Sequence, residues 1–230
     1  LDWAFLGREY HVHNLYEFWS KHLMPVLGIL VDQFATQLPA DLVSTLKEMR
    51  STTTGPDPDV PGNTPFWVSD GMVHKRGGWY ISVRMRSQRA QGNEDFESKA
   101  KAWHAGGGVL QARVHGDEHD QVRARFDWHV LPGVTEEWRT DPLPRDAKGR
   151  CGGNSFSGMV SDGELGAAAF EYLPGLADAS KYSVVSAKKG YFFSNLGVVA
   201  LGNSIRRSFP GQGKAIVTTL DQARWRGDIT

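Results

Sequence analysis

Apolar residues recur with two different periods along the chain, and the change of period divides it. Between Leu15 and Arg50 they return every three or four residues, which predicts amphipathic helix. The residues of this stripe are Leu15, Phe18, Trp19, Leu23, Val26, Leu27, Leu30, Val31 and Phe34. We expect Pro25 to kink or divide the helix, because proline lacks the N–H that a helix interior needs. A second, short helix is predicted from about Ala40 to Met49.

From Phe66 onward the pattern becomes one of short strands separated by glycine-containing turns. Strands are predicted at 79–85, 109–114, 164–172, 182–186, 190–194, 198–202 and 216–220. The sequences HGDEHD, KKG and PGQGK are expected to form turns between them. Many short strands with few helices predict a mainly β fold, an antiparallel sandwich preceded by a few helices. The turn-rich segment 51–65 marks the predicted boundary, with domains at 1–55 and 66–230.

The overall charge indicates neither a nucleic-acid nor a membrane partner. Lys and Arg number 26 and Asp and Glu also number 26, so no global field favours phosphate or lipid headgroups. No apolar run of about 18 residues is present, so no membrane span is expected. The single Cys151 allows no internal disulfide. His11 and His13 are not followed by a third ligand at matching spacing, so no metal site is predicted.

Basic residues gather locally in one predicted strand. In WYISVRMRS, residues 79–87, the alternation places Tyr80, Ser82, Arg84 and Arg86 on one face. With Arg89 just beyond, this face suits a polymer that carries carboxylate or sulfate groups. The alternative is that these side chains form the solvated outer face of a sheet.

Residues of the kind that sugar sites use follow directly. Asn93 and Glu94 offer an amide and a carboxylate to hydroxyl groups, and the indoles of Trp103 and Trp128 could pack on a pyranose. We therefore predict Asn93, Trp103 and Trp128 as further substrate-binding residues. The alternative for the acidic stretch is a turn with capping acids.

Seven segments, in order, resemble the central β-domain of the family 8 polysaccharide lyases. They are SQR (87–89), Glu94, WHAGGG (103–108), FDWHVLPGVTEEW (126–138), FSGMVSDGELGAAAFEY (156–172), AKKGYFFSNLGVVALGNSI (187–205) and VTTLDQARWRGDI (217–229). The family contains chondroitin AC, chondroitin ABC, hyaluronate and xanthan lyases. The helical start resembles the last helices of the family's incomplete α/α toroid, and DWAFLGR places Arg8 on the catalytic arginine. The chain departs from the pattern at Val12, where a second arginine is often found.

The resemblance implies β-elimination on a uronic-acid polymer, with Arg8 and Glu94 as catalytic residues. In the family a tyrosine carries both proton steps, helped by a histidine and an asparagine of the toroid. The motifs that hold these three residues are missing from this sequence. We therefore expect the chain alone to lack them and to depend on a preceding toroid segment of the same enzyme.

The sequence thus predicts part of a lyase that cleaves chondroitin or dermatan sulfate or hyaluronan. It is expected to bind an anionic polysaccharide, to be secreted or periplasmic, and to need no cofactor, with a structural divalent cation left open. The alternative from another class is a β-sandwich that binds polysaccharide without cleaving it, or a family member that has lost its chemistry. For Arg8 and Glu94 the alternative is an interdomain salt bridge.

Overall fold

A computed structural model of the chain describes residues 24–51, 61–92, 103–115, 118, 125–143, 151–175 and 182–224. These residues fall into two compact units, a helical one within residues 24–51 and a β unit within residues 61–224. Each unit is described by itself.

The helical unit consists of α2 (Met24–Phe34) and α3 (Ala40–Ser51). Pro25 lies in the first turn of α2 and not inside a longer helix, a position where its missing N–H is tolerated. The two helices pack through Leu27, Val31 and Leu46, which are buried. The predicted stripe is confirmed for Leu27 and Val31, whereas its part before Met24 lies outside the described residues.

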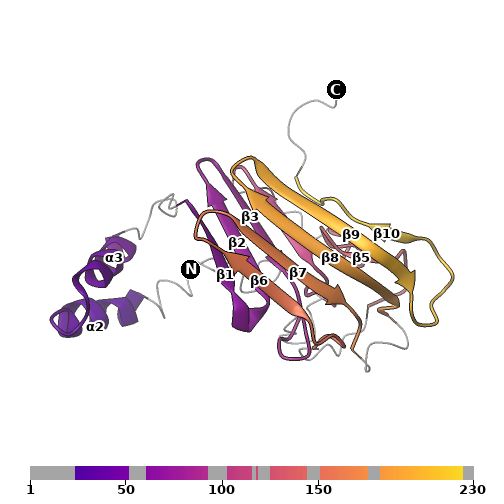
Figure 1. Cartoon of the computed structure of the whole chain (residues 1–230), viewed down its shortest axis with the longest axis horizontal. Coiled ribbons are helices and arrows are strands. Elements are labelled where there is room, and N and C mark those ends of the chain that lie inside the picture. Colours follow the sequence, from indigo (N-terminus) through magenta and orange to yellow (C-terminus); the bar gives the residue numbers. More distant parts are fainter. Residues whose placement is uncertain are drawn as a thin grey trace. The chain divides into compact units, whose positions relative to one another are not determined.

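The β unit contains two four-stranded antiparallel sheets and a two-stranded one (Figure 1). The first sheet has the order β1 (Gly62–Phe66), β2 (Gly71–Arg76), β3 (Trp79–Arg84) and β4 (Val109–Arg113). The second has the order β6 (Ser157–Ser161), β7 (Gly166–Tyr172), β8 (Val185–Ser194) and β9 (Gly197–Arg207). The third pairs β5 (Thr135–Glu137) with β10 (Ile216–Thr218).

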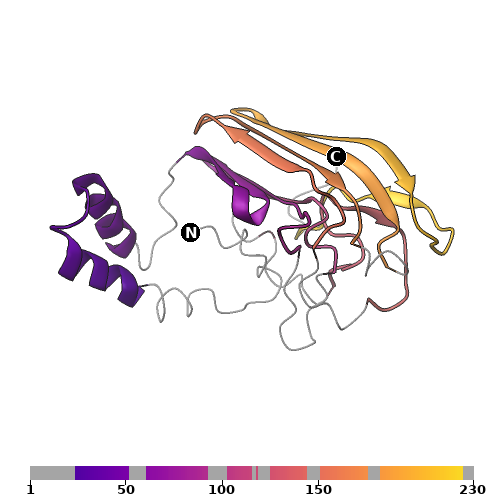
Figure 2. The same ribbon diagram turned by 60° about the horizontal axis from the view of Figure 1, so that its bottom comes forward.

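The two four-stranded sheets enclose the main core (Figure 2). Met72 and Val83 from the first sheet join Phe170 and Tyr191 from the second in one buried cluster. A polar bridge crosses the same interior: Nε2 of His74 lies 3.0 Å from the carbonyl oxygen of Ser194. The predicted mainly β antiparallel fold is therefore confirmed.

Some strands differ from the sequence prediction. The strands β1, β2, β5 and β6 were not predicted, because they are short and rich in polar residues and glycine. KKG is not a turn: Lys188, Lys189 and Gly190 lie inside β8 and pair with β9. The two strands predicted at 182–186 and 190–194 are therefore largely one strand, with an irregularity between Ser186 and Lys188.

Candidate functional site

The predicted basic face does not continue as far as Arg86. The strand β3 ends at Arg84, so the alternation of faces no longer applies beyond it. Met85 is 0% exposed and Arg86 is 1% exposed. The interpretation of Arg86 as part of an open substrate-binding face is therefore corrected, because its side chain lies in the interior.

Arg84 is half-buried, and its side chain contacts the chain itself. Its Nε donates a hydrogen bond of 3.2 Å to the carbonyl oxygen of Gly92. Its own carbonyl oxygen accepts a hydrogen bond of 3.0 Å from the backbone N–H of Gly108. Both ends of the stretch between Gly92 and Gly108 are thus bound to one residue.

Arg89 is the predicted arginine that remains at the surface. Its Nη2 lies 2.7 Å from Oδ1 of Asp70 and 2.8 Å from the carbonyl oxygen of Ser157. The side chain of Asp70 is 0% exposed, while that of Arg89 is 53% exposed. A buried carboxylate therefore holds a guanidinium that still reaches solvent. Its role in substrate binding stays a prediction.

The two predicted tryptophans are buried. Trp103 is 4% exposed, and its Nε1 donates a hydrogen bond of 3.0 Å to Oγ of Ser183. Trp128 is 8% exposed and packs in a second core cluster with Phe126. Neither indole offers an open face to a sugar in the described part of the chain, which corrects their interpretation as surface platforms. They are instead anchors of the loops that connect the sheets.

The remaining predicted residues are Arg8, Asn93 and Glu94, and they lie outside the described residues. So do His11 and His13. Among the residues that the structure does describe, no group of three or more His, Cys, Asp or Glu side chains could hold a metal ion. Within the same residues, no helix is long and apolar enough to cross a membrane.

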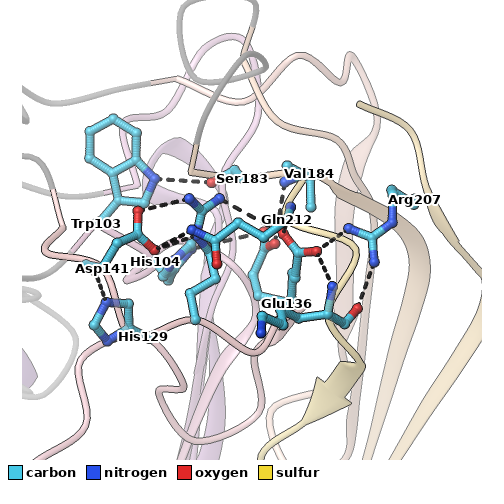
Figure 3. Close-up of polar contacts among 12 residues, drawn as sticks. Trp103, His104, His129, Glu136, Asp141, Ser183, Val184, Arg207 and Gln212 are labelled. Atoms are coloured by element: carbon cyan, nitrogen blue, oxygen red, sulfur yellow. Dashed lines mark hydrogen bonds and ion pairs between the residues drawn. The ribbon is translucent and has the colours of Figure 1, made fainter. Parts of the chain in front are cut away.

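A buried polar centre, which the sequence did not reveal, surrounds Glu136 of β5 (Figure 3). The phenol of Tyr172 donates a hydrogen bond to its Oε1, and the backbone N–H of Val184 donates one of 3.4 Å to its Oε2. Nδ1 of His104 lies 3.9 Å from the same Oε1. Burial raises the pKa of Glu136 to about 7. Two consecutive glutamates in TEEW resemble a surface turn, so the sequence gives no signal of this site.

Two further buried bases face this centre. Nζ of Lys189 donates hydrogen bonds to the carbonyl oxygens of Gly133 at 2.6 Å and Gly107 at 3.3 Å. Burial lowers the pKa of Lys189 to about 7. Burial and the nearby charge of Arg86 lower the pKa of His104 to about 3, so its imidazole is neutral at physiological pH.

A second network, nearer the surface, fixes the loop after β9 (Figure 3). Glu137 accepts hydrogen bonds from Arg207 and from the backbone N–H groups of Gln212, at 2.9 Å, and Lys214, at 2.8 Å. Nε2 of Gln212 also lies 3.2 Å from Oδ1 of Asp141. The adjacent glutamates of β5 are both buried but have different partners: Glu136 contacts other interior groups, whereas Glu137 accepts hydrogen bonds from the loop after β9.

The comparison with known families settles the fold. Residues 61–230 match the family model described as "Polysaccharide lyase family 8, super-sandwich domain". The chain belongs to polysaccharide lyase family 8.

Known family 8 proteins are similar over most of this chain. A chondroitinase-AC from Pedobacter heparinus is 30% identical over 171 residues, which cover 74% of this chain and 23% of the relative. A hyaluronate lyase from Thermasporomyces composti is 29% identical over 182 residues, which cover 74% of this chain and 21% of the relative. The chain therefore spans less than a quarter of the length of these two relatives.

Solved structures agree with the family. A chondroitinase AC lyase structure that reveals the active site through enzyme–oligosaccharide complexes superposes with a TM-score of 0.68 at 26% identity. The superposed region covers 84% of this chain and 28% of the chondroitinase AC lyase chain. A Streptomyces coelicolor A3 chondroitin AC lyase in complex with chondroitin sulphate superposes with a TM-score of 0.60 at 23% identity, which shows the shared fold. The superposed region covers 97% of this chain and 29% of the Streptomyces coelicolor chain.

Among the described residues of this family 8 chain, the buried tyrosines and histidines, and the half-buried His129, are unsuited to abstracting a proton from a polymer. Burial raises the pKa of Tyr172 and of Tyr191 well above the ordinary value for tyrosine, which disfavours the phenolate that a base requires. His74 and His104 are buried. His129 has contacts at both ring nitrogens, with Oδ1 of Asp127 at 3.0 Å and the carbonyl oxygen of Asp141 at 2.6 Å.

Proposed function

We propose that this chain is part of a glycosaminoglycan lyase that cleaves chondroitin sulfate, dermatan sulfate or hyaluronan by β-elimination. The observation that carries the proposal is the family 8 match over residues 61–230. The relative at 30% identity is a chondroitinase-AC, and the second relative is a hyaluronate lyase, so both are lyases named for uronic-acid polymers.

The reaction needs a base, an acid and a group that neutralises the uronate carboxylate. Neutralisation acidifies the C5–H bond, and a base removes this proton. The electron pair forms the C4–C5 double bond as the C4–O bond breaks, and the leaving oxygen takes up a proton. No oxidant, reductant or cofactor enters this balance.

Arg8 and Glu94 are the residues of this chain that we assign to the chemistry. A guanidinium beside a tyrosine phenol lowers its pKa by favouring the phenolate. A carboxylate that binds the same guanidinium through two oxygens fixes its orientation. Neither residue is itself a suitable base, because arginine stays protonated and a glutamate held by arginine is a weak proton acceptor. The base would come from a toroid segment of the same enzyme.

Arg89 is the best-supported contact for the anionic polymer. It is half-exposed and its guanidinium is held by Asp70, so binding would cost little side-chain entropy. An extracellular polymer is met outside the cell, and we propose a secreted or periplasmic location for the enzyme.

The test is an elimination assay that follows the ultraviolet absorbance of the unsaturated uronate product. Chondroitin sulfate, dermatan sulfate and hyaluronan are each offered to the 230-residue chain, alone and joined to a family 8 toroid segment. We expect product only from the joined form, and Arg8→Ala should remove most of that activity. The absence of product from every substrate with the joined form would refute the proposal.

The second candidate is a sandwich that binds the polysaccharide without cleaving it. This candidate needs no base, and burial disfavours the phenolate form of Tyr172 and Tyr191 by raising the pKa of each. Salt-dependent binding of chondroitin sulfate by the joined form, with no product formed, would support this candidate.

A further inference from the structure

A tryptophan and an arginine lie close together along the edge of β6 that faces away from β7. Nε1 of Trp67 donates a hydrogen bond of 3.4 Å to the carbonyl oxygen of Met159. Nη2 of Arg89 donates one of 2.8 Å to the carbonyl oxygen of Ser157. Residues two apart in a strand direct their carbonyl groups to the same edge. The two side chains are therefore anchored about 7 Å apart on one strand.

This edge of β6 forms a seam with the first sheet (Figure 1). Oγ of Ser161 donates a hydrogen bond of 2.8 Å to the carbonyl oxygen of Asn63 in β1, and the N–H of Asn63 donates one of 2.8 Å to the carbonyl oxygen of Gly163. The strand β1 leads directly into the 3₁₀ helix η3 (Trp67–Ser69), which Trp67 begins. The indole thus belongs to the chain segment that joins the edges of the two sheets.

The backbone between the two side chains is held at several points. Asp70 ends η3 in a left-handed conformation with a φ of 51°. Its carbonyl oxygen accepts a hydrogen bond of 2.8 Å from the N–H of Met85, and its buried carboxylate binds Arg89 at 2.7 Å. Trp67 and Arg89 are therefore fixed relative to each other before any ligand arrives. Such preorganisation lowers the conformational entropy that binding costs.

Both side chains reach solvent from these anchors. Trp67 is 60% exposed, whereas Trp103 and Trp128 are buried. The side chain of Arg89 is 53% exposed, and both of its side-chain contacts with described residues use Nη2. The N–H groups on Nη1 and Nε therefore remain available to an anion. An open indole beside an open guanidinium offers an apolar face and a positive charge at the same place.

We propose that Trp67 and Arg89 form a binding subsite for a uronic-acid polysaccharide. The indole packs on the C–H face of a pyranose ring, and the guanidinium binds a carboxylate or sulfate group of an adjacent sugar. Uronic-acid polymers carry both features on successive units, so one short stretch of polymer reaches both side chains. This inference rests on the proposed function, which supplies the class of ligand, and it adds a tryptophan that the sequence pattern did not single out.

The first test measures the binding of a chondroitin sulfate oligosaccharide to the 230-residue chain by isothermal titration calorimetry. Trp67→Ala should raise Kd about tenfold, because a stacked aromatic ring is a typical binding hot spot. Trp67→Phe keeps an aromatic face and should recover part of the affinity. The matched control is Trp138→Ala, because Trp138 is 48% exposed but follows β5 in the third sheet. That control should leave Kd unchanged.

Three outcomes of this titration would overturn the inference. The first is a Kd that Trp67→Ala leaves unchanged, and the second is an absence of saturable binding by the unaltered chain. The third is an equal loss of affinity in Trp138→Ala, since it would show a general effect of exposed indoles.

Salt separates the contribution of the charge from that of the ring. Arg89→Gln should raise Kd about fivefold at about 0.1 M salt, and should match the unaltered chain at about 1 M, where the Debye length is about 3 Å. Arg89→Lys keeps the charge and should retain the salt dependence. The loss caused by Trp67→Ala should persist at both concentrations, because an apolar contact is not screened. If Arg89→Gln has no effect at low salt, or its effect persists at high salt, the guanidinium is not an ionic contact and the subsite is refuted.

Folding of each variant is checked by far-ultraviolet circular dichroism and urea unfolding, because Arg89→Gln removes an ionic partner of the buried Asp70. Where Arg89→Gln does not fold, Trp67→Ala decides, since Trp67 is mainly exposed.

The proposed function and the subsite fail in different experiments. A joined form that cleaves no uronic-acid polymer refutes the proposed function, even when the 230-residue chain binds chondroitin sulfate through Trp67 and Arg89. A joined form that cleaves the polymer, with Kd unchanged in Trp67→Ala, refutes the subsite alone.

Discussion

The phenol of Tyr172 donates a hydrogen bond to the carboxyl group of Glu136 in the interior of the β unit, across 36 residues of sequence. Tyr172 is 1% exposed and Glu136 is 2% exposed, so neither group can exchange this partner for bulk water. The contact joins β7 to β5, the short strand that also receives β10. It therefore links the second and third sheets through one polar group.

Tyr172→Phe should destabilise the β unit by about 1–3 kcal/mol, because a buried carboxyl group loses a donor. Tyr191→Phe is the comparison, since its equally buried phenol donates to a neutral carbonyl oxygen, that of Gly108, at 3.2 Å. That change should cost about 0.5–1.5 kcal/mol. The free energy of unfolding in urea measures both. If Tyr191→Phe costs as much free energy of unfolding as Tyr172→Phe, or more, the buried carboxyl group of Glu136 does not need the hydrogen bond from Tyr172.

Glu136→Gln should remove a pH dependence of stability between about pH 4.5 and 7. Burial raises the pKa of Glu136 from 4.5 to about 7, so folding favours the protonated form. The stability that protonated Glu136 contributes is fully present below pH 4.5 and is lost as the pH rises through about 7. The loss corresponds to about 3 kcal/mol at most. Urea unfolding of both proteins across this range provides the measurement.

The contribution of His104 to stability changes with pH in the opposite direction over part of the same range. Its pKa is lowered from 6.5 to about 3, so its contribution is present above pH 6.5 and is lost as the pH falls. His104 is present in both proteins, so the difference between the two stability curves reports Glu136 together with its effect on its neighbours. Burial lowers the pKa of Lys189 from 10.5 to about 7, and the charge of Glu136 opposes that shift, so the contribution of Lys189 to stability changes mainly between about pH 7 and 10.5, above the window. Parallel curves for the two proteins would contradict the prediction.

Arg89 and Asp70 should show coupled effects on stability. In a double-mutant cycle of Arg89→Ala with Asp70→Asn, we expect an interaction energy of about 1–2 kcal/mol, because the carboxylate is buried. Asparagine is chosen because residue 70 has a φ of 51°, a conformation that it tolerates. The control pair is Arg50 and Asp32, which has the same 2.7 Å distance but side chains that are 45% and 59% exposed. That pair should give less than about 1 kcal/mol. Coupling no larger than in the control would sink the idea that burial strengthens the Arg89 contact.

Gly133→Ala should be far more destabilising than Gly163→Ala. Both glycines have positive φ, 79° and 94°, so each alanine is strained by about 1–2 kcal/mol. Only at Gly133 would the new Cβ also collide with backbone, 2.5 Å from the carbonyl oxygen of Gly108. Overpacking should add about 1–3 kcal/mol there. Thermal unfolding of the two variants checks this, and similar melting temperatures would refute it.

The sequence predicted the sheets better than the polar interior. Alternation identified β3, because its side chains Ile81 and Val83 face the main core. It also identified β4, where Val109 packs in the second cluster and Leu110 packs against the main core. It missed β1, where Pro65 is tolerated because this strand lies at a sheet edge. The buried Asn63 of the same strand contacts His74, with Nδ2 3.2 Å from Nδ1. It also misplaced Lys189, whose neighbours in KKG resemble a turn, whereas its side chain is buried and donates to two carbonyl oxygens.

The sequence predicted which residue types would gather in the candidate site, but not which of their side chains would be buried. The arginines at 84, 86 and 89 looked equivalent, because the strand was assumed to continue. Its end at Arg84 gives the three side chains different surroundings. Only the tertiary structure could show that glycines distant in sequence surround Arg86, because no local pattern encodes such a contact.

The order of strands has a consequence for the speed of folding. In both four-stranded sheets every pairing joins strands that follow one another among the described strands. The pairs β1–β2, β2–β3, β6–β7 and β8–β9 close short loops and can form early, whereas β3–β4 and β7–β8 close the longer connections 85–108 and 173–184. The contacts between the sheets close much longer loops, and His74 meets Ser194 across 120 residues. We therefore expect the docking of the two preformed sheets to be the slow step, and its rate to depend on Met72 and Phe170 more than on any turn.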